Sequence, residues 1–421
     1  MLPGLSVLLP TFVTADLLNR QLTMNRQTGK TFLLIVALCA FWGGCQTSEE
    51  PAPTDEERCI VTGADLSYVN EIERNGGVWR DEAGQQVDPY RFFVDKGAGM
   101  IRLRLFHTPE NIESFCGDSI SASGLADLLE GAKRVKTAGA GLMVSLHYGD
   151  YFNDPGVQYR PKAWQGLTGQ TLLDSIYQYT YGVLEHLKKQ NTLPEILVIG
   201  NETTWGFVDP WYPHGSGPGT DGWDWPEDAQ KFNTAFQAVD DFNMKNTTSV
   251  KKAIHLTVET VEETAATFTQ QGISGYDVLG FSFYPAFSPN VTVAEAGKIV
   301  SRLVWKYSGK EVMLLETGWK WTDEGADDYP NFLGNSPVIA LPVSEQGQLD
   351  FLNALKQTLR TNGATAMFYW EPAWISSQMC DRWGMGSSYE NASFFDFNNQ
   401  NRPLKAFDFF EKCNPPVNAD E

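Results

Sequence analysis

The sequence is short of positive charge and of histidine, and each shortage excludes a class of function. It carries 32 lysine and arginine residues against 52 aspartate and glutamate residues, which leaves a formal net charge of −20. Phosphate groups would be repelled by such a chain, so we expect no nucleic-acid partner. Only five histidines occur, and no cluster of histidine, cysteine and aspartate has the spacing of a catalytic zinc site.

Two common sequence motifs are also absent. No Gly-x-Ser-x-Gly turn occurs, which argues against a serine hydrolase, and no glycine-rich phosphate loop follows a candidate strand. Tryptophan, in contrast, is abundant: its 13 copies exceed what a core needs, and many fall in segments predicted to be loops. This composition suits an exported protein that acts on a neutral substrate.

The first 58 residues are predicted to lie outside the folded domain. Residues 24–45 combine a basic start, a short apolar stretch and small residues before Cys45. The apolar stretch is too short to span a membrane, which takes ~20 residues. The segment resembles a bacterial lipoprotein signal, in which the cysteine becomes the lipidated first residue, although Trp42 departs from the usual motif. An ordinary signal peptide is the alternative.

Residues 1–23 are interpreted as an upstream extension before a start at Met24, and residues 46–58 as a flexible acidic tether. We therefore expect an exported protein that touches the membrane only through a lipid anchor at the outer membrane, with exposure at the cell surface as a further hypothesis.

The remaining residues, 59–421, contain no linker, repeat or low-complexity tract, so they are predicted to form one domain, and we expect a monomer. In an oxidising compartment, one or two disulfides are expected among the four cysteines of this domain. A bridge from Cys59 to Cys413 would join its ends, but the pairing of these two with Cys116 and Cys380 stays open.

Short apolar runs alternate with segments of helical periodicity along this domain, which predicts βα units and a parallel sheet. Repetition of this unit favours a single (β/α)8 TIM barrel, and an open doubly wound sheet is the second choice. The candidate strands are Ile60–Leu66, Met100–Phe106, Gly141–His147, Ile196–Gly200, Ala253–Val258, Val278–Phe283, Val312–Glu316 and Ala364–Trp370. Helical segments include Leu125–Thr137, Leu172–Lys189, Ala229–Met244, Val293–Tyr307 and Gln346–Arg360.

In such a barrel the active site lies at the C-terminal ends of the strands. Here those ends carry polar or aromatic side chains, and the set as a whole is typical of a carbohydrate site, although each residue alone has an ordinary structural explanation. The predicted substrate-binding residues are Asp65, Arg102, Arg104, His147, Asn201, Trp205, Tyr284, Trp319, Trp370 and Trp374.

Two buried strands each deliver a glutamate at this end, Glu202 and Glu316. A carboxylate pair is the usual machinery for hydrolysing glycosidic bonds, and a separation of ~5–5.5 Å would predict retention of anomeric configuration. Glu202, next to Asn201 and near Trp205, is predicted to be the acid/base with a raised pKa. Glu316, which an arginine of the second strand would keep ionised, is predicted to be the nucleophile. This chemistry requires no cofactor.

Several stretches together give the chain a family resemblance. It resembles glycoside hydrolase family 53, the endo-β-1,4-galactanases of the clan A retaining glycosidases. The resemblance implies a β-1,4-galactan or galacto-oligosaccharide substrate and the same roles for Glu202 and Glu316. The matching stretches are Gly63–Ser67, Arg102–Phe106, His147-Tyr148, Asp154–Gly156, Pro161–Trp164, Gly200–Glu202, Gly280–Pro285, Glu316-Thr317 and Phe368–Trp374.

Two loops depart from the family pattern. After the third strand, Phe152 replaces a platform tryptophan. After the seventh strand, Tyr329 occupies the place of an expected histidine, so the resemblance implies a structural calcium site with Asp327 and Asn331 as its matching ligands. An acidic solvated loop is the alternative to calcium.

Tryptophans among glycine and proline in loops are predicted to act as platforms for sugar rings, although part of the set is expected to serve only loop packing. The candidates are Trp205, Trp211, Trp223, Trp225, Trp319, Trp321, Trp370 and Trp374. Two alternative functions remain open: the same mechanism on mannan, xylan or glucan, and a glycan-binding lipoprotein, which would not need two strand-end carboxylates.

Overall fold

The computed structural model describes residues 59–210 and 224–412. None of the helices within these ranges combines the length and apolar character that a membrane crossing requires. Several sequence-based predictions lie outside the described residues and stay predictions: the signal segment, Cys45, the tether, Cys413, Trp211 and Trp223.

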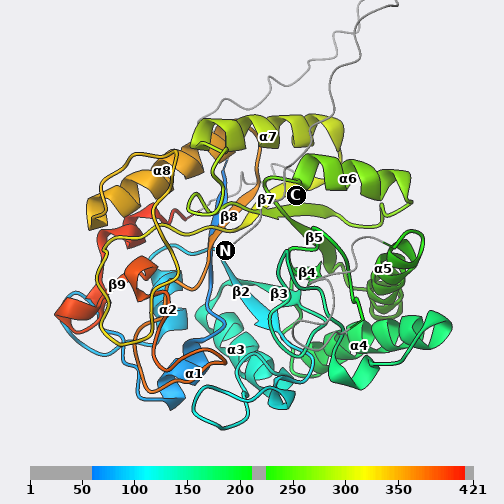
Figure 1. Ribbon diagram of the computed structural model, residues 1–421, viewed down its shortest axis with the longest axis horizontal. Coiled ribbons are helices and arrows are strands. Elements are labelled where there is room, and N and C mark those ends of the chain that lie inside the picture. The colour runs from blue at the N-terminus through cyan, green and yellow to red at the C-terminus, as the bar shows by residue number, and fades with distance from the viewer. Residues whose placement is uncertain (1–58, 211–223, 413–421) are drawn as a thin grey trace, which may run out of the picture. The chain divides into compact units, whose positions relative to one another are not determined.

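Eight parallel strands close into a barrel in chain order (Figure 1). The barrel is closed because the first strand pairs with the eighth, with Val61 opposite Ala366. This confirms the predicted (β/α)8 barrel and excludes the open doubly wound sheet. The strands are β1 (Val61–Asp65), β2 (Met100–Leu105), β3 (Gly141–Leu146), β4 (Ile196–Ile199), β5 (Lys251–Thr257), β6 (Val278–Ser282), β7 (Glu311–Glu316) and β8 (Ala366–Tyr369).

The helices form a ring outside the barrel (Figure 1). They are α1 (Val69–Arg74), α2 (Pro89–Asp95), α3 (Leu125–Ala138), α4 (Gly169–Lys189), α5 (Glu227–Asn246), α6 (Val261–Gln270), α7 (Val293–Lys306) and α8 (Glu345–Thr361), and a short hairpin of β9 (Phe395–Asp396) and β10 (Arg402–Pro403) follows β8. The sequence analysis singled out α3, α4, α5, α7 and α8. It did not single out α1, α2 and α6, whose 6, 7 and 10 residues give a helical period less room to repeat than the 14 or more residues of the other helices.

The barrel interior changes from apolar to polar along the strands. Near the N-terminal ends it is filled by side chains such as Met143, Ile196, Val278 and Phe368, which form one buried apolar cluster. A larger cluster lies between the barrel and the helices. Toward the C-terminal ends, arginine, histidine, serine and carboxylate side chains replace the apolar ones, and they form the base of the site described below.

An irregularity in β7 decides where its last side chain points. Met313 and Leu315 belong to the barrel interior, so simple alternation would turn Glu316 outward. The register between β6 and β7 shifts at Phe281 and Ser282, and Ser282 lies opposite Glu316. A bulge of this kind re-aims a side chain, and here it brings Glu316 into the mouth of the barrel.

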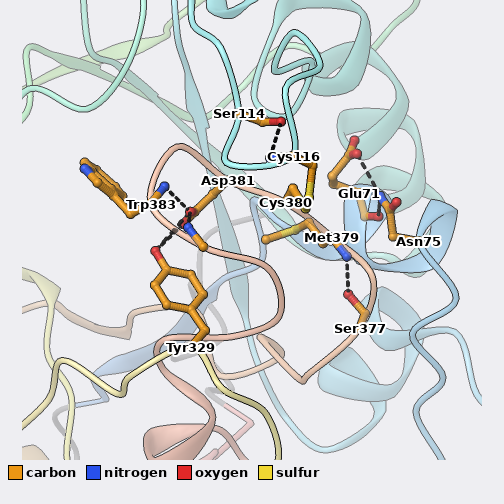
Figure 2. The surroundings of a disulfide bond; sticks show 11 residues. Glu71, Asn75, Ser114, Cys116, Tyr329, Ser377, Met379, Cys380, Asp381 and Trp383 are labelled. Carbon is orange, nitrogen blue, oxygen red and sulfur yellow. Dashed lines mark hydrogen bonds between the residues drawn. A yellow bond between two sulfur atoms is a disulfide. The ribbon is translucent and has the colours of Figure 1, made fainter.

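A disulfide joins the loops after β2 and β8, where Cys116 is bonded to Cys380 across 264 residues of sequence (Figure 2). The sequence analysis expected one or two disulfides for a protein exported to an oxidising compartment, and this is one of them.

Candidate active site

A cavity of about 820 Å³ lies at the C-terminal ends of the strands. Both predicted catalytic carboxylates, Glu202 and Glu316, line it. Six of the predicted substrate-binding residues also line it: His147, Asn201, Trp205, Tyr284, Trp370 and Trp374.

Glu202 is held by a tight turn directly after β4. Gly200 has a φ of 79°, and a Cβ there would come within 2.4 Å of the Thr203 side chain, so the position requires glycine. Glu202 itself has a φ of 44°, which is uncommon for a residue with a side chain. The turn is held by Gln158, whose Nε2 donates to the carbonyls of Asn201 and Glu202 at 2.9 and 3.1 Å. Such strained backbone is typical of functional sites.

Glu316 lies between two hydrogen-bond donors. Arg102 Nη1 lies 2.8 Å from its Oε1, and the hydroxyl of Tyr284 donates to its Oε2 at 3.0 Å. Both contacts favour the ionised carboxylate, as predicted for a nucleophile. Burial opposes them and is the larger effect, so the pKa of Glu316 is raised above its ordinary value rather than lowered.

Glu202 has a different environment. Burial, followed by the negative charge of Glu316, raises its pKa to about 8, and the charge of Arg102 offsets this only in part. Because the arginine contacts Glu316 and not Glu202, the first carboxylate to ionise is Glu316, and Glu202 keeps its proton near neutral pH. The sequence analysis attributed the raised pKa to Trp205, but that side chain is 52% exposed and burial with Glu316 accounts for the shift.

Four predicted substrate-binding residues do not line the cavity: Trp319, described below, and three charged residues. Asp65, Arg102 and Arg104 are fully buried beneath it. Arg102 Nη1 lies 2.6 Å from Asp65 Oδ2, and Arg104 forms an ion pair with Glu371, a strand-end carboxylate whose pKa burial raises to about 8. The ring of Tyr68, which lines the cavity, covers the Arg104 guanidinium at 4.0 Å. These charges therefore position the lining residues rather than touch a ligand.

Asn201 and His147 present hydrogen-bond donors at the cavity. The Oδ1 of Asn201 accepts from Arg102 Nη2 at 2.8 Å, and its Nδ2 donates to the carbonyl of Asn153 at 2.9 Å, which leaves the second amide hydrogen for a ligand. His147 Nδ1 accepts from the backbone N–H of Asn153 at 3.2 Å, so its proton is on Nε2. Burial lowers the pKa of His147 well below its ordinary value, and the ring is neutral.

The predicted tryptophan platforms divide into two groups. Trp205, Trp370 and Trp374 line the cavity. Trp319 does not: it is buried, and its ring stacks on Phe351 of α8 with centroids 4.5 Å apart. The sequence could not separate these cases because a strand-end tryptophan can turn either to the cavity or to a neighbouring helix.

Trp321 and Trp225 are likewise absent from the cavity lining. The indole of Trp321 donates to the carbonyl of Glu390 at 3.1 Å, and the ring of Trp225 packs edge-on against Phe268. Both therefore serve loop packing.

Exposed aromatic residues that the sequence analysis missed lie at the mouth of the cavity. Trp383 is 56% exposed and stacks on Phe152 with centroids 6.1 Å apart. Phe287 and Phe332, which also line the cavity, stack on each other with centroids 6.3 Å apart. Their exposure is the signal for a ligand, and sequence spacing does not reveal it.

The loop that carries Trp383 is tied down next to the disulfide (Figure 2). Asp381, directly after Cys380, accepts hydrogen bonds from the backbone N–H of Trp383 at 2.7 Å and from the hydroxyl of Tyr329 at 2.9 Å. The covalent bond to Cys116 therefore fixes the base of the segment that presents the indole.

His255 and Ser282 are further site residues that the sequence analysis did not select. His255 lies within β5 and is completely buried, and Ser282 ends β6 and lines the cavity. Alternation along β5 from Ala253, which faces the barrel interior, would have placed His255 inside the barrel. Its bonds to Asn201 and Ser282 depend on long-range pairing that the sequence does not show.

The calcium hypothesis finds no support. Within the described ranges, no group of three or more histidine, cysteine, aspartate or glutamate side chains is arranged to hold a metal ion. Asp327 accepts hydrogen bonds from Ser376 Oγ and from the backbone N–H of Ser387, while Asn331 donates to the carbonyl of Glu324. The proposed ligands are thus engaged with the protein itself.

A closed (β/α)8 barrel with two unlike carboxylates at the ends of β4 and β7 defines the class of the protein: it is a barrel glycosidase. Within this class, the chain belongs to glycosyl hydrolase family 53, whose family model matches residues 61–410.

Individual relatives agree with this assignment. The chain is 36% identical over 360 residues to an arabinogalactan endo-β-1,4-galactanase of Cellvibrio japonicus, with 84% of this chain and 90% of the relative covered. It is 26% identical to an endo-β-1,4-galactanase of Bacillus subtilis, with 91% and 98% covered. Among solved structures, the family 53 catalytic domain from Ignisphaera aggregans superposes with a TM-score of 0.73 at 28% identity, with 86% of this chain and 97% of that chain covered.

Proposed function

We propose that the protein is a retaining endo-β-1,4-galactanase in which Glu202 is the acid/base and Glu316 the nucleophile. The observation that carries this proposal is the opposite surroundings of the two carboxyl groups: Arg102 and Tyr284 donate to Glu316, whereas burial and the charge of Glu316 keep Glu202 protonated. Two titratable groups with separated pKa values are the mark of an acid and nucleophile pair.

The reaction proceeds in two displacements. In the first, a carboxylate oxygen of Glu316 attacks the anomeric carbon while the proton of Glu202 passes to the leaving oxygen, so the glycosidic bond breaks and a glycosyl ester forms. In the second, Glu202, now ionised, takes a proton from water. The water oxygen then bonds to the anomeric carbon and displaces Glu316.

The substrate is assigned from the relatives together with the cavity. The relatives from Cellvibrio japonicus and Bacillus subtilis are named as endo-β-1,4-galactanases. The aromatic side chains that line the cavity suit the apolar face of a hexose, and the donors of Asn201 and His147 suit its hydroxyl groups. Tests on linear galactan, mannan, xylan and glucan, read as reducing ends released, separate galactan from the other polymers.

Removal of either carboxylate tests the mechanism. We expect Glu316→Ala to reduce release of oligosaccharides from galactan to background, and Glu202→Gln to reduce kcat by roughly 10²–10⁴-fold. Glu311→Gln is the matched control, because Glu311 begins the same strand as Glu316 and pairs with Lys251 at the opposite end of the barrel. Full activity in either active-site variant would refute the assignment.

For localisation, the lipoprotein-like segment that ends at Cys45 supports an exported, lipid-anchored protein at the outer membrane. We expect wild-type protein to incorporate a labelled fatty acid during growth and to partition with membranes, and Cys45→Ala to lose both properties. Protease treatment of intact cells would show whether the domain is exposed at the surface.

A further inference from the structure

A chain of hydrogen bonds joins the turn before Glu202 to the end of β6. Asn201 Oδ1 lies 3.0 Å from His255 Nδ1, and His255 Nε2 lies 2.7 Å from Ser282 Oγ. Asn201 and Ser282 are therefore coupled through the imidazole of His255, which is completely inaccessible to solvent.

The direction of every hydrogen bond in this chain is determined. The carbonyl of Asn153 can only accept, so it fixes Nδ2 of Asn201 as the donor and Oδ1 as the acceptor. Arg102 Nη2, which can only donate, contacts the same Oδ1 at 2.8 Å and agrees with this orientation. His255 must then carry its hydrogen on Nδ1, and because the ring is neutral, Nε2 must accept from the hydroxyl of Ser282.

This arrangement uses the hydroxyl hydrogen of Ser282. The same hydroxyl is hydrogen-bonded to the carboxyl group of Glu202, and both groups line the cavity; a serine that donated in this bond would lower the pKa of Glu202, so the direction of the bond decides its effect. A serine hydroxyl has one hydrogen and two acceptor positions. Once its hydrogen points to His255, Ser282 can only accept from Glu202, and it can do so only when the carboxyl group is protonated.

We propose that His255 is a positioning residue that fixes the orientation of the Ser282 hydroxyl, so that Ser282 stabilises the protonated form of Glu202 and keeps it competent as the acid. The inference deepens the proposed function and rests on the acid/base role of Glu202. It gives His255 of β5 and Ser282 of β6 a role in proton transfer, whereas Arg102 and Tyr284 act on Glu316.

Other charged and titratable groups also face Glu202. They are Glu316 from β7, Asp154 from the loop after β3, Arg102 from β2 and Tyr284 from the loop after β6. None of them changes in the variants below, so a shift in the pH profile reports the Ser282 contact itself.

The two possible orientations of Ser282 predict opposite shifts. If Ser282 accepts from protonated Glu202, its removal in Ser282→Ala destabilises that form, and the alkaline limb of kcat/KM moves to lower pH by about 0.5–1 unit. If Ser282 instead donates to ionised Glu202, the same variant moves the limb to higher pH. A shift upward or no shift would overturn the proposal.

Further variants distinguish orientation from simple loss of packing. His255→Asn keeps a donor for Asn201 but loses the acceptor for Ser282, and we expect its alkaline limb to move downward as well. Ser282→Thr retains the hydroxyl and should restore the wild-type profile. Ser288→Ala is the matched control, because Ser288 is similarly buried and lines the same cavity, and we expect its alkaline limb to stay in place.

A spectroscopic measurement tests the tautomer without relying on activity. Nitrogen-15 NMR of the wild-type protein should show one neutral histidine protonated on Nδ1 whose signal is lost in His255→Asn. If the ring of His255 is protonated on Nε2 instead, the proposal is refuted even if Glu202 remains the acid. Conversely, full activity of Glu202→Gln would refute the proposed function while leaving the tautomer assignment intact.

Discussion

Replacement of Arg102 by methionine tests how the buried charges support the nucleophile. Arg102 is 1% exposed, and one of its nitrogens lies 2.6 Å from Asp65 and 2.8 Å from Glu316, while another donates to Asn201. Methionine fills similar space without charge. The variant therefore removes the arginine partner of two buried carboxyl groups and one amide oxygen.

The expected cost follows from the burial. Removal of one partner of a buried ion pair costs about 3–5 kcal/mol, a large part of the ~5–15 kcal/mol that stabilises a typical domain. Urea unfolding followed by tryptophan fluorescence measures this loss. Arg91→Met is the control: Arg91 pairs with Asp95 on the surface of α2, where a salt bridge is worth about 0–1 kcal/mol.

The loss should depend on pH in a defined direction. Burial already raises the pKa of Glu316 in the folded protein, so this group destabilises the fold as pH rises above the ordinary carboxyl pKa. Without Arg102 the pKa of Glu316 rises further. Both proteins lose this stability equally until the pH passes the raised pKa of Glu316 in the wild type, so the difference in unfolding free energy between wild type and Arg102→Met is expected to grow as the pH rises above that pKa.

Kinetics give a second measure of the same contact. Because Glu316 must be ionised to attack, the acid limb of kcat/KM should move to higher pH in Arg102→Met. If the variant folds poorly, the double variant Asp65→Asn/Arg102→Met removes one of the orphaned charges and should recover part of the stability. An acid limb that stays in place, together with a stability loss that does not change with pH, would refute the reasoning.

Two further predictions concern the cavity mouth. Trp383→Ala should lower kcat/KM on galactan by roughly fivefold, corresponding to about 1 kcal/mol of lost stacking, with little effect on a short chromogenic substrate. Trp305→Ala, which removes an 83% exposed indole on α7, is the control. Equal losses on both substrates in Trp383→Ala would contradict a platform role. Replacing Cys116 and Cys380 together by serine should lower the free energy of unfolding by about 2–4 kcal/mol, because the bond closes a loop of 264 residues, and an unchanged urea midpoint would contradict this.

The barrel could be predicted because its signals are local. Each strand is a short apolar run, and the helices that were recognised are long enough for the apolar period to repeat. The short helices α1, α2 and α6 were missed because 6, 7 and 10 residues offer fewer than three full turns. Strand ends can also be recognised locally in the sequence. For this reason the sequence could predict that Glu202, Glu316 and Tyr284 lie at one cavity, as they do in the structure.

The parts of the site that could not be predicted depend on which way a side chain faces. Arg104 and Trp319 stand at the same kind of position as cavity residues, yet one is covered by Tyr68 and the other stacks on Phe351. Trp383 reaches the cavity from a loop whose course is fixed by the disulfide and Asp381. These outcomes follow from contacts between distant segments.

The carboxylate pair itself depends on two local departures from regular structure. Regular alternation along β7 would turn Glu316 away from the barrel, and the register shift opposite Ser282 brings it inside. After β4, the positive φ of Gly200 and Glu202 turns the second carboxyl group over the same opening. Both departures are costly on their own, and both are held by hydrogen bonds from neighbouring strands and loops. The barrel therefore supplies the rigid frame, and its two irregular strand ends determine that the glutamates face one cavity with different partners.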